Sequence, residues 1–228
     1  MTLTRTTART AGVVALAAMA TLAAACDDDQ EPPPAGTSTA ASGAATTAPD
    51  AAAIPLEGTP EAPVRWHEGA VDDESGAVLA ARQFVALRYA LGASEQPNTL
   101  TPLFSAVTTG SVEENWTEPR QNPSPPPDQL RVGPLFAWVQ ASSAATGDAT
   151  AVDMCLDYGW SGQGTTPKAR TDVAGTTRFE VRQVTEAGSQ AWKVESVTDP
   201  AGPDVVGADA AGACDTWVKT HTSPESPA

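Results

Sequence analysis

Asp153 and Asp157 are the first candidates for acid–base chemistry in the chain. They lie in the segment AVDMCLDY, whose alternation of apolar and polar residues predicts a β-strand. Alternate side chains of a strand share a face. One side therefore carries Val152, Met154, Leu156 and Tyr158, and the other carries Asp153, Cys155 and Asp157. Because the apolar side should face the core, a solvated outer face is favoured over a catalytic pair; Glu180, between Phe179 and Val181, follows the same rule.

The chain has two histidines, and both are expected outside the core. His67 follows an N-terminal tether and His221 lies in the C-terminal tail. A Ser/His/Asp or Cys/His catalytic site within the domain is therefore not expected. No His, Cys and carboxylate cluster has metal-ligand spacing, so we expect no metal and no other cofactor.

The third reactive group is Cys26, which follows a short uncharged segment. Arg5 and Arg9 form a basic leader, and the run 11–25 has 15 residues, fewer than the roughly 20 that span a bilayer. This pattern predicts an export signal over residues 1–25. The segment LAAAC resembles a lipobox, although Ala23 stands where Leu is more common. We expect lipidation of Cys26 (palmitate among the acyl chains) and anchoring on the extracytoplasmic face of the cell membrane; the alternative is an ordinary signal with a chance cysteine.

Cys155 and Cys214 remain as an even pair once Cys26 is acylated. An exported protein resides in an oxidising compartment, where disulfides persist. We expect a Cys155–Cys214 disulfide, worth roughly 4 kcal/mol in the chain-entropy model. Two free buried thiols are the alternative.

Four of the six tryptophans are candidates for ligand or partner contact. Trp138 and Trp192 lie within predicted strands, where a core or cavity-lining position is expected. Trp160 lies in the loop GWSGQG, which lacks the Lys and following helix of a phosphate-binding loop and is expected to be mobile. Trp116 precedes a Pro-rich loop. Exposed aromatics in loops commonly anchor ligands or partners.

Helices are expected first in the folded part. Apolar residues at three- and four-residue steps predict a helix through Ala77, Ala80, Phe84, Leu87 and Leu91 that ends near Gly92. Thr101-Pro102 indicates the start of a second helix, which Gly110 stops. Ser111 and Glu114 have capping-box spacing and indicate a third helical turn.

Strands are expected after the Pro-rich loop. Segments 135–141 and 149–158 form one predicted hairpin, and 176–185 and 190–198 form another. Helices followed by antiparallel hairpins indicate an α+β fold with helices on one face of a sheet.

Composition sets the domain plan and excludes some partners. Residues 26–63 are rich in Asp, Pro, Ala, Ser and Thr and predict a disordered tether spanning about 30 to 35 Å. We expect a domain over 64–218 and a disordered tail over 219–228. With 13 Lys and Arg against 28 Asp and Glu the net charge is −15, and loss of Arg5 and Arg9 with the signal makes it −17. Such a surface disfavours nucleic acid.

The chain resembles the small NTF2-like lipoproteins exported by actinobacteria. The resemblance lies in the lipobox and tether, the strands AVDMCLD, TRFEVRQV and AWKVESV, and the tail GACDTW, in that order. It implies a curved antiparallel sheet wrapped around N-terminal helices to form a cone. This fold hosts enzymes, carriers and assembly modules alike.

Two functions are compatible with these features. The first is a non-enzymatic binding or assembly module of the cell envelope, which recognises a protein partner. The second is a carrier of a small apolar ligand, or an isomerase or dehydratase, that uses the cone cavity. A filled cone favours the first function, and a deep cavity with an inward carboxylate favours the second.

Overall fold

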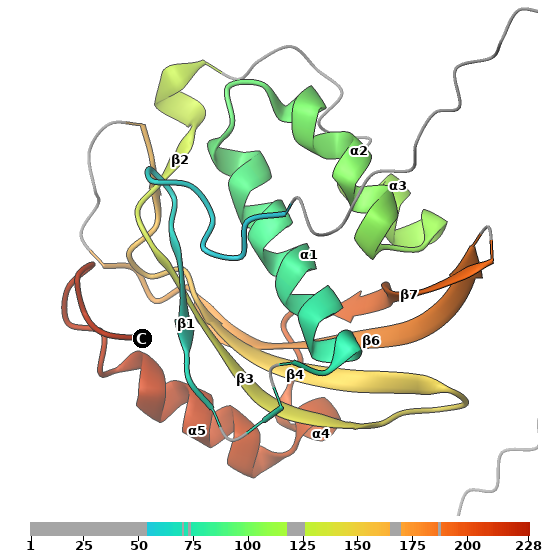
Figure 1. The fold of residues 1–228 in the computed structure, drawn as a ribbon. Coiled ribbons are helices and arrows are strands. Elements are labelled where there is room, and N and C mark those ends of the chain that lie inside the picture. Colours follow the sequence, from blue (N-terminus) through green and yellow to red (C-terminus); the bar gives the residue numbers. More distant parts are fainter. Residues whose placement is uncertain (1–53, 70, 73, 118–125, 165–169, 187) are drawn as a thin grey trace, which may run out of the picture. The chain divides into compact units, whose positions relative to one another are not determined.

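The computed structural model describes residues 54–69, 71–72, 74–117, 126–164, 170–186 and 188–228, and for 114–117 it describes the backbone alone (Figure 1). All belong to one compact unit, Thr46–Ala228. The predicted signal, Cys26 and the tether up to residue 53 lie outside the described residues. Residues 54–63 differ from the predicted tether, because Ile54 and Ala62 are buried in the core.

A curled five-stranded sheet forms the centre of the fold. The order is β1-β3-β4-β6-β7, and every neighbouring pair is antiparallel except β1 with β3. The strands are β1 (Val64–His67), β3 (Leu135–Ala144), β4 (Ala149–Asp157), β6 (Ala174–Glu186) and β7 (Ser189–Thr198). A separate two-stranded sheet pairs β2 (Arg131–Val132) with β5 (Gly162–Gln163). The two predicted hairpins are confirmed. The strands β1, β2 and β5 were not predicted, because each has too few residues to show an alternation of apolar and polar side chains.

Three helices lie on the inner side of the sheet (Figure 1). They are α1 (Gly76–Ala93), α2 (Pro97–Val107) and α3 (Gly110–Thr117). The side chain of Ser75 caps α1 by accepting a hydrogen bond from the Val78 amide. The predicted start of α2 at Pro102 is wrong: Pro97 occupies the first turn, where its missing amide hydrogen costs nothing, and Pro102 is inside the helix.

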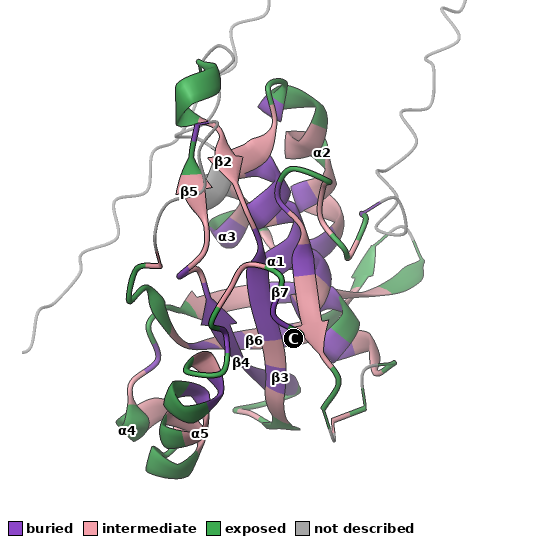
Figure 2. Ribbon diagram, turned by 90° about the vertical axis from the view of Figure 1, so that its left-hand side faces the viewer, coloured by how far each residue is buried: buried purple, intermediate pink, exposed green. Residues whose placement is uncertain are grey.

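The space between α1 and the sheet is filled by large apolar side chains. Phe84 contacts Phe104 and Phe179 edge-to-face, with ring centroids 6.0 and 5.9 Å apart. These rings and Met154 are fully buried. Figure 2 shows α1 buried along most of its length. The interior at this point is therefore a packed core rather than an open cone.

The outer side of the sheet carries two further helices, α4 (Pro203–Val206) and α5 (Ala208–Val218). A second apolar cluster lies there and contains Phe136, Cys155, Cys214 and Trp217. The prediction of helices on one face only is thus wrong. The mixed α+β class and the curved sheet are confirmed.

The predicted parity of β4 is confirmed. Val152, Met154 and Leu156 belong to the core cluster under α1, and Cys155 belongs to the outer cluster. The register shifts lie between Val139 and Ala141 of β3 and at Glu180/Val181 of the β6–β7 pair. The alternation along β4 is therefore undisturbed.

No helix within the described residues has the length and apolar character that crossing a membrane requires.

Candidate functional site

The outer face of β4 holds a buried ionic cluster instead of the expected solvated aspartates. Asp157 is completely buried, and its Oδ2 lies 2.7 Å from Nδ1 of His221 and 3.1 Å from Nη2 of Arg170. Its Oδ1 accepts a 2.8 Å hydrogen bond from the Gly159 amide. The carboxylate is tolerated in the interior because three groups satisfy it: the nearby Gly159 amide and the side chains of Arg170 and His221, which come from later parts of the sequence.

His221 is correspondingly not part of a disordered tail. Its ring is 1% exposed and stacks on Phe136 with centroids 4.0 Å apart. Trp160 and Arg170 both donate to its backbone carbonyl, at 2.9 and 3.1 Å. The prediction of a disordered segment 219–228 is wrong because a charged partner on the sheet binds the segment.

An Asp–His pair is two thirds of a hydrolase triad, yet no described residue supplies a nucleophile to this one. Nε2 of His221 is buried and makes no hydrogen bond to any described residue. A general base must reach the proton that it removes, and an enclosed ring nitrogen does not. The cluster therefore fixes the C-terminal segment in place.

Asp153 is also buried on the outer face, at 4% exposure, in place of the expected solvation. It accepts two 2.7 Å hydrogen bonds from Nε and Nη2 of Arg178 on the neighbouring strand. The hydrogen bond to Asp153 raises the pKa of Arg178. This bidentate ion pair links β4 to β6, and both carboxylate oxygens of Asp153 are occupied by the guanidinium of Arg178.

The predicted disulfide is present in the structure. Cys155 of β4 and Cys214 of α5 are joined, with their Cα atoms 5.4 Å apart and 59 positions apart in the sequence. Trp217, three residues further on, packs beside it in the outer cluster. The disulfide and the Asp157–His221 pair together hold α5 and the tail on the sheet.

The tryptophans have mainly internal contacts. Trp138 lies on the outer face, between His67 and Trp217 at ring distances of 5.5 and 5.7 Å, and so does not line the core under α1. Trp192 packs against that core, over Gly76. Trp160 is half-buried and its indole N–H is satisfied, which contradicts a mobile exposed loop. Trp116 lies in α3, and its side chain is outside the described part.

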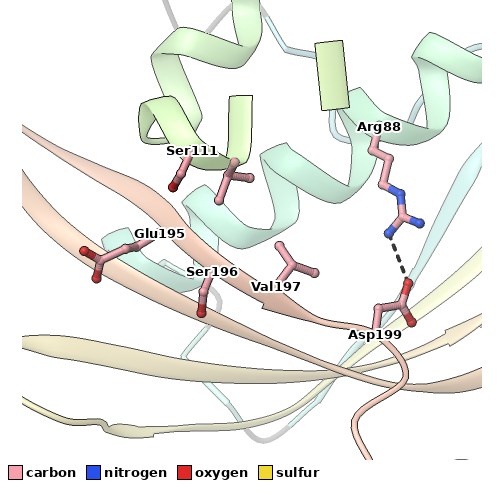
Figure 3. A pocket seen from close by; sticks show the side chains of 7 residues that line it. Arg88, Ser111, Glu195, Ser196, Val197 and Asp199 are labelled. Atoms are coloured by element: carbon pink, nitrogen blue, oxygen red, sulfur yellow. Dashed lines mark hydrogen bonds and ion pairs between the residues drawn. The ribbon is translucent and has the colours of Figure 1, made fainter. Parts of the chain in front are cut away.

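One concave feature of the described residues is a groove between α1 and the end of β7, which we call the Arg88 groove. Arg88 of α1 and Asp199, just beyond β7, form an ion pair at 3.2 Å across it (Figure 3). A cavity of about 500 Å³ lies on one side of this pair and one of about 480 Å³ on the other. Both cavities are lined by Arg88 and Asp199, so the ion pair divides one groove into two lobes.

The first lobe, the β7 lobe, is polar. Ser111 of α3 faces Glu195, Ser196 and Val197 of β7 (Figure 3), and Val112 of α3 also lines the lobe. Glu195 is paired with Arg182 at 3.0 Å, and Ser196 donates to Glu180 at 3.0 Å. Its polar groups on β7 therefore already have partners within the sheet.

The second lobe, the Tyr158 lobe, combines cations, a phenol and apolar groups. Arg88 and Arg131 line it together with Tyr158, Ser161 and Asp172, and Leu156, Val173, Ala174 and Pro200 supply apolar surface. The Arg131 guanidinium lies 4.9 Å from the ring centroid of Tyr89 and 5.7 Å from that of Tyr158. Tyr89 donates to the carbonyl of Gly133 at 2.9 Å, which holds the ring in place.

Burial raises the pKa of both tyrosines in this cluster. Arg131 opposes the shift at each, and Arg88 does so at Tyr158. Burial prevails because a phenolate has to give up its hydration, so both phenols remain protonated donors at neutral pH.

The sequence analysis did not identify Arg88, Arg131, Tyr158 or Asp199 as site residues. Arg88 belongs to no motif within the predicted helix, and Asp199 directly follows the last predicted strand. One usable signal was that the chain has only two tyrosines, Tyr89 and Tyr158, and that Tyr89 directly follows Arg88 in a predicted helix. Their meeting in space depends on how α1 packs on β4, which no local pattern specifies.

Among the described residues, no group of three His, Cys, Asp or Glu is arranged to hold a metal ion. Comparisons with protein-family models, curated proteins and solved structures found no match to the chain.

Proposed function

We propose that the protein is a lipid-anchored binding module of the cell envelope, without enzymatic activity, and that it recognises its ligand at the Arg88 groove. The lipid would be attached to Cys26 on the extracytoplasmic side, and the tether would hold the module off the membrane. The fold we propose is NTF2-like, which the curled sheet around α1 supports.

The filled interior carries this proposal. Phe84, Met154 and Phe179 occupy the space where a cone-type enzyme would hold its substrate, and all three are fully buried. The described cavities around Arg88 lie at the rim, open to solvent on both sides of the ion pair. A ligand reaches this groove without any rearrangement of the core.

The charges of the groove favour binding over proton transfer. Glu195 and Asp199 are engaged with arginines at 3.0 and 3.2 Å. A carboxylate held by an arginine is occupied as an acceptor and is a poor general base. Asp153 and Asp157 are paired on the far side of the sheet.

Photo-crosslinking in the native cells tests the proposal. Val173 lines the Tyr158 lobe and is 56% exposed, and Leu79 of α1 is an exposed apolar residue, at 37%, that does not line either lobe. A photoreactive phenylalanine analogue at position 173 of the full chain should give adducts that the same analogue at position 79 does not. The adduct mass tells a protein partner from a small molecule.

Equal adducts at the two positions, or none at position 173, would contradict recognition at the groove. A soluble product released from the crosslinked ligand would contradict the absence of enzymatic activity.

A further inference from the structure

We propose that the Tyr158 lobe binds a small organic acid with an apolar body, and that Arg131 takes its carboxylate. The inference rests on the proposed function and names the ligand class for one lobe of the same groove.

Arg131 is the residue that points to an anion. Arg88, Arg170, Arg178 and Arg182 each pair with a carboxylate. Arg131 makes no ion pair and no side-chain hydrogen bond within the described residues; its guanidinium lies over the faces of Tyr89 and Tyr158 and beside Gly92 of α1. The chain has 28 acidic residues against 13 basic ones, so an arginine that lines a cavity without an acidic partner among the described residues is unexpected.

The surroundings of Arg131 prepare it for a planar anion. A guanidinium presents its N–H groups in a fixed fork that matches a carboxylate, and stacking on two rings limits its rotation before a ligand arrives. Less side-chain entropy is then lost on binding. Tyr158 lines the same lobe, and its hydroxyl makes no hydrogen bond within the described residues, so it is a second donor for the anion.

The acidic residues of the lobe limit the charge of the ligand. Asp172 is exposed at the rim and Asp199 stands beside Arg88. These two carboxylates and the net negative charge of the protein repel a phosphate dianion more strongly than they repel a monoanion. A carboxylate is therefore favoured over a phosphate.

The apolar part of the lobe sets the body of the ligand. Leu156, Val173, Ala174 and Pro200 line the lobe with Arg131, and its volume is about 480 Å³. Small-molecule sites are typically about 300 to 1,000 Å³ and mostly apolar with a few placed polar groups. A ring or short chain that bears one carboxylate fits this combination.

The probes for the test are 4-fluorobenzoate and its uncharged isostere 4-fluorobenzamide, followed by fluorine NMR on the full chain in a non-ionic detergent. We expect 4-fluorobenzoate to bind at least tenfold more tightly than the amide. Arg131→Gln should weaken benzoate binding at least tenfold. Lys219→Gln removes one exposed cation at the C-terminal end of α5 and should change binding less than twofold.

Tyr158→Phe supplies a second variant that keeps both stacked rings and removes only the hydroxyl. It should weaken benzoate binding about three- to tenfold and leave the amide unaffected. Benzoate binding that is equal to amide binding, undetectable, or equally affected by Arg131→Gln and Lys219→Gln would overturn the proposal. Displacement of the benzoate by equimolar inorganic phosphate would also overturn it, because the lobe would then be a general anion site.

These outcomes can be separated from the proposed function. Adducts at position 173 without benzoate binding would leave recognition at the groove standing and remove only the carboxylate assignment. Benzoate binding that depends on Arg131, without adducts at position 173, would leave the carboxylate site standing and would contradict recognition of a natural ligand at the groove in cells.

Discussion

At the residue scale, the chain places both of its tyrosines in one cluster. Tyr89 comes from α1 and Tyr158 follows β4, and their ring centroids are 6.1 Å apart with Arg131 over both faces. Burial of a phenol costs little while it is protonated and hydrogen-bonded, and much more once it is ionised. The cluster therefore couples the ionisation of two residues to folding.

Titration of the tyrosines is the first prediction. Their ionisation, followed by tyrosinate absorbance, should occur at higher pH in the folded chain than in the urea-unfolded chain, since burial raises both pKa values above the ordinary 10.0. Because the folded pKa values are raised, the stability they contribute is complete below about pH 10 and is lost as the pH rises through the folded values.

Tyr89→Phe should reduce that alkaline loss of stability, and Lys219→Gln should not. The urea midpoint measured at a series of alkaline pH values reports the difference. Identical titration curves for the folded and unfolded chains would show that the phenols are not buried.

The Asp157–His221 pair gives the second residue-scale prediction. His221→Ala leaves a fully buried carboxylate with only Arg170 and the Gly159 amide as partners, and should lower the free energy of unfolding by about 3 kcal/mol. Lys219→Ala, in the same segment but exposed, should change it by less than about 0.5 kcal/mol. Urea unfolding followed by tryptophan fluorescence measures both.

A double-mutant cycle with Asp157→Asn distinguishes the pair from general packing. Coupling of more than about 1 kcal/mol is expected for two residues in direct contact. Additive effects would mean that the ring contributes only through its stacking on Phe136.

At the element scale, one glycine shows how α1 is seated on the sheet. Gly76 opens α1 directly over Trp192 of β7, and a Cβ atom there would overlap the indole ring. Gly212 is inside α5, and a Cβ atom there would meet nothing within 4 Å. The same substitution should therefore have opposite effects at the two sites.

Gly76→Ala should destabilise the protein by about 1 to 3 kcal/mol, because the Trp192 ring has to move within a packed surface. Gly212→Ala should stabilise it by about 0.5 to 1 kcal/mol, because glycine is a poor residue in a helix interior. Denaturant midpoints of the two variants measure the difference. Stabilisation by Gly76→Ala would contradict the close approach of α1 to Trp192.

The elements also show what a single sequence could predict. Long elements with a clear period, such as α1 and the four long strands, were predicted close to their observed positions. The parity of Asp153 and Asp157 was predicted correctly, but their exposure was not. Asp157 is bound by His221 of the tail, 64 positions away, and Asp153 by Arg178 of β6, 25 positions away, so the burial of each depends on contacts that are distant in the sequence. The groove was missed for the same reason: Arg88, Arg131 and Tyr158 belong to three elements that meet only in the tertiary structure.

At the whole-molecule scale, the two ends of the folded unit have different roles. The C-terminal end is fixed: His221 is held by Asp157, and Arg65 of β1 donates to the carbonyl of Ser226 at 3.2 Å. The N-terminal side continues into the predicted tether and signal. In the proposed arrangement, the module is therefore anchored from its N-terminal side.

Lipid attachment at Cys26 is the prediction that decides this arrangement. The short uncharged run that ends in Ala24-Ala25-Cys26 is too short for a bilayer-spanning helix, so membrane attachment should depend on the cysteine. The natural chain should partition into the detergent phase after phase separation, and Cys26→Ala should remain in the aqueous phase. Cys155→Ala together with Cys214→Ala is the control, since it removes the other two cysteines and their disulfide but not the proposed lipid site, and its detergent partitioning should be unchanged. Equal partitioning of Cys26→Ala and the natural chain would show that another part of the protein holds it at the membrane.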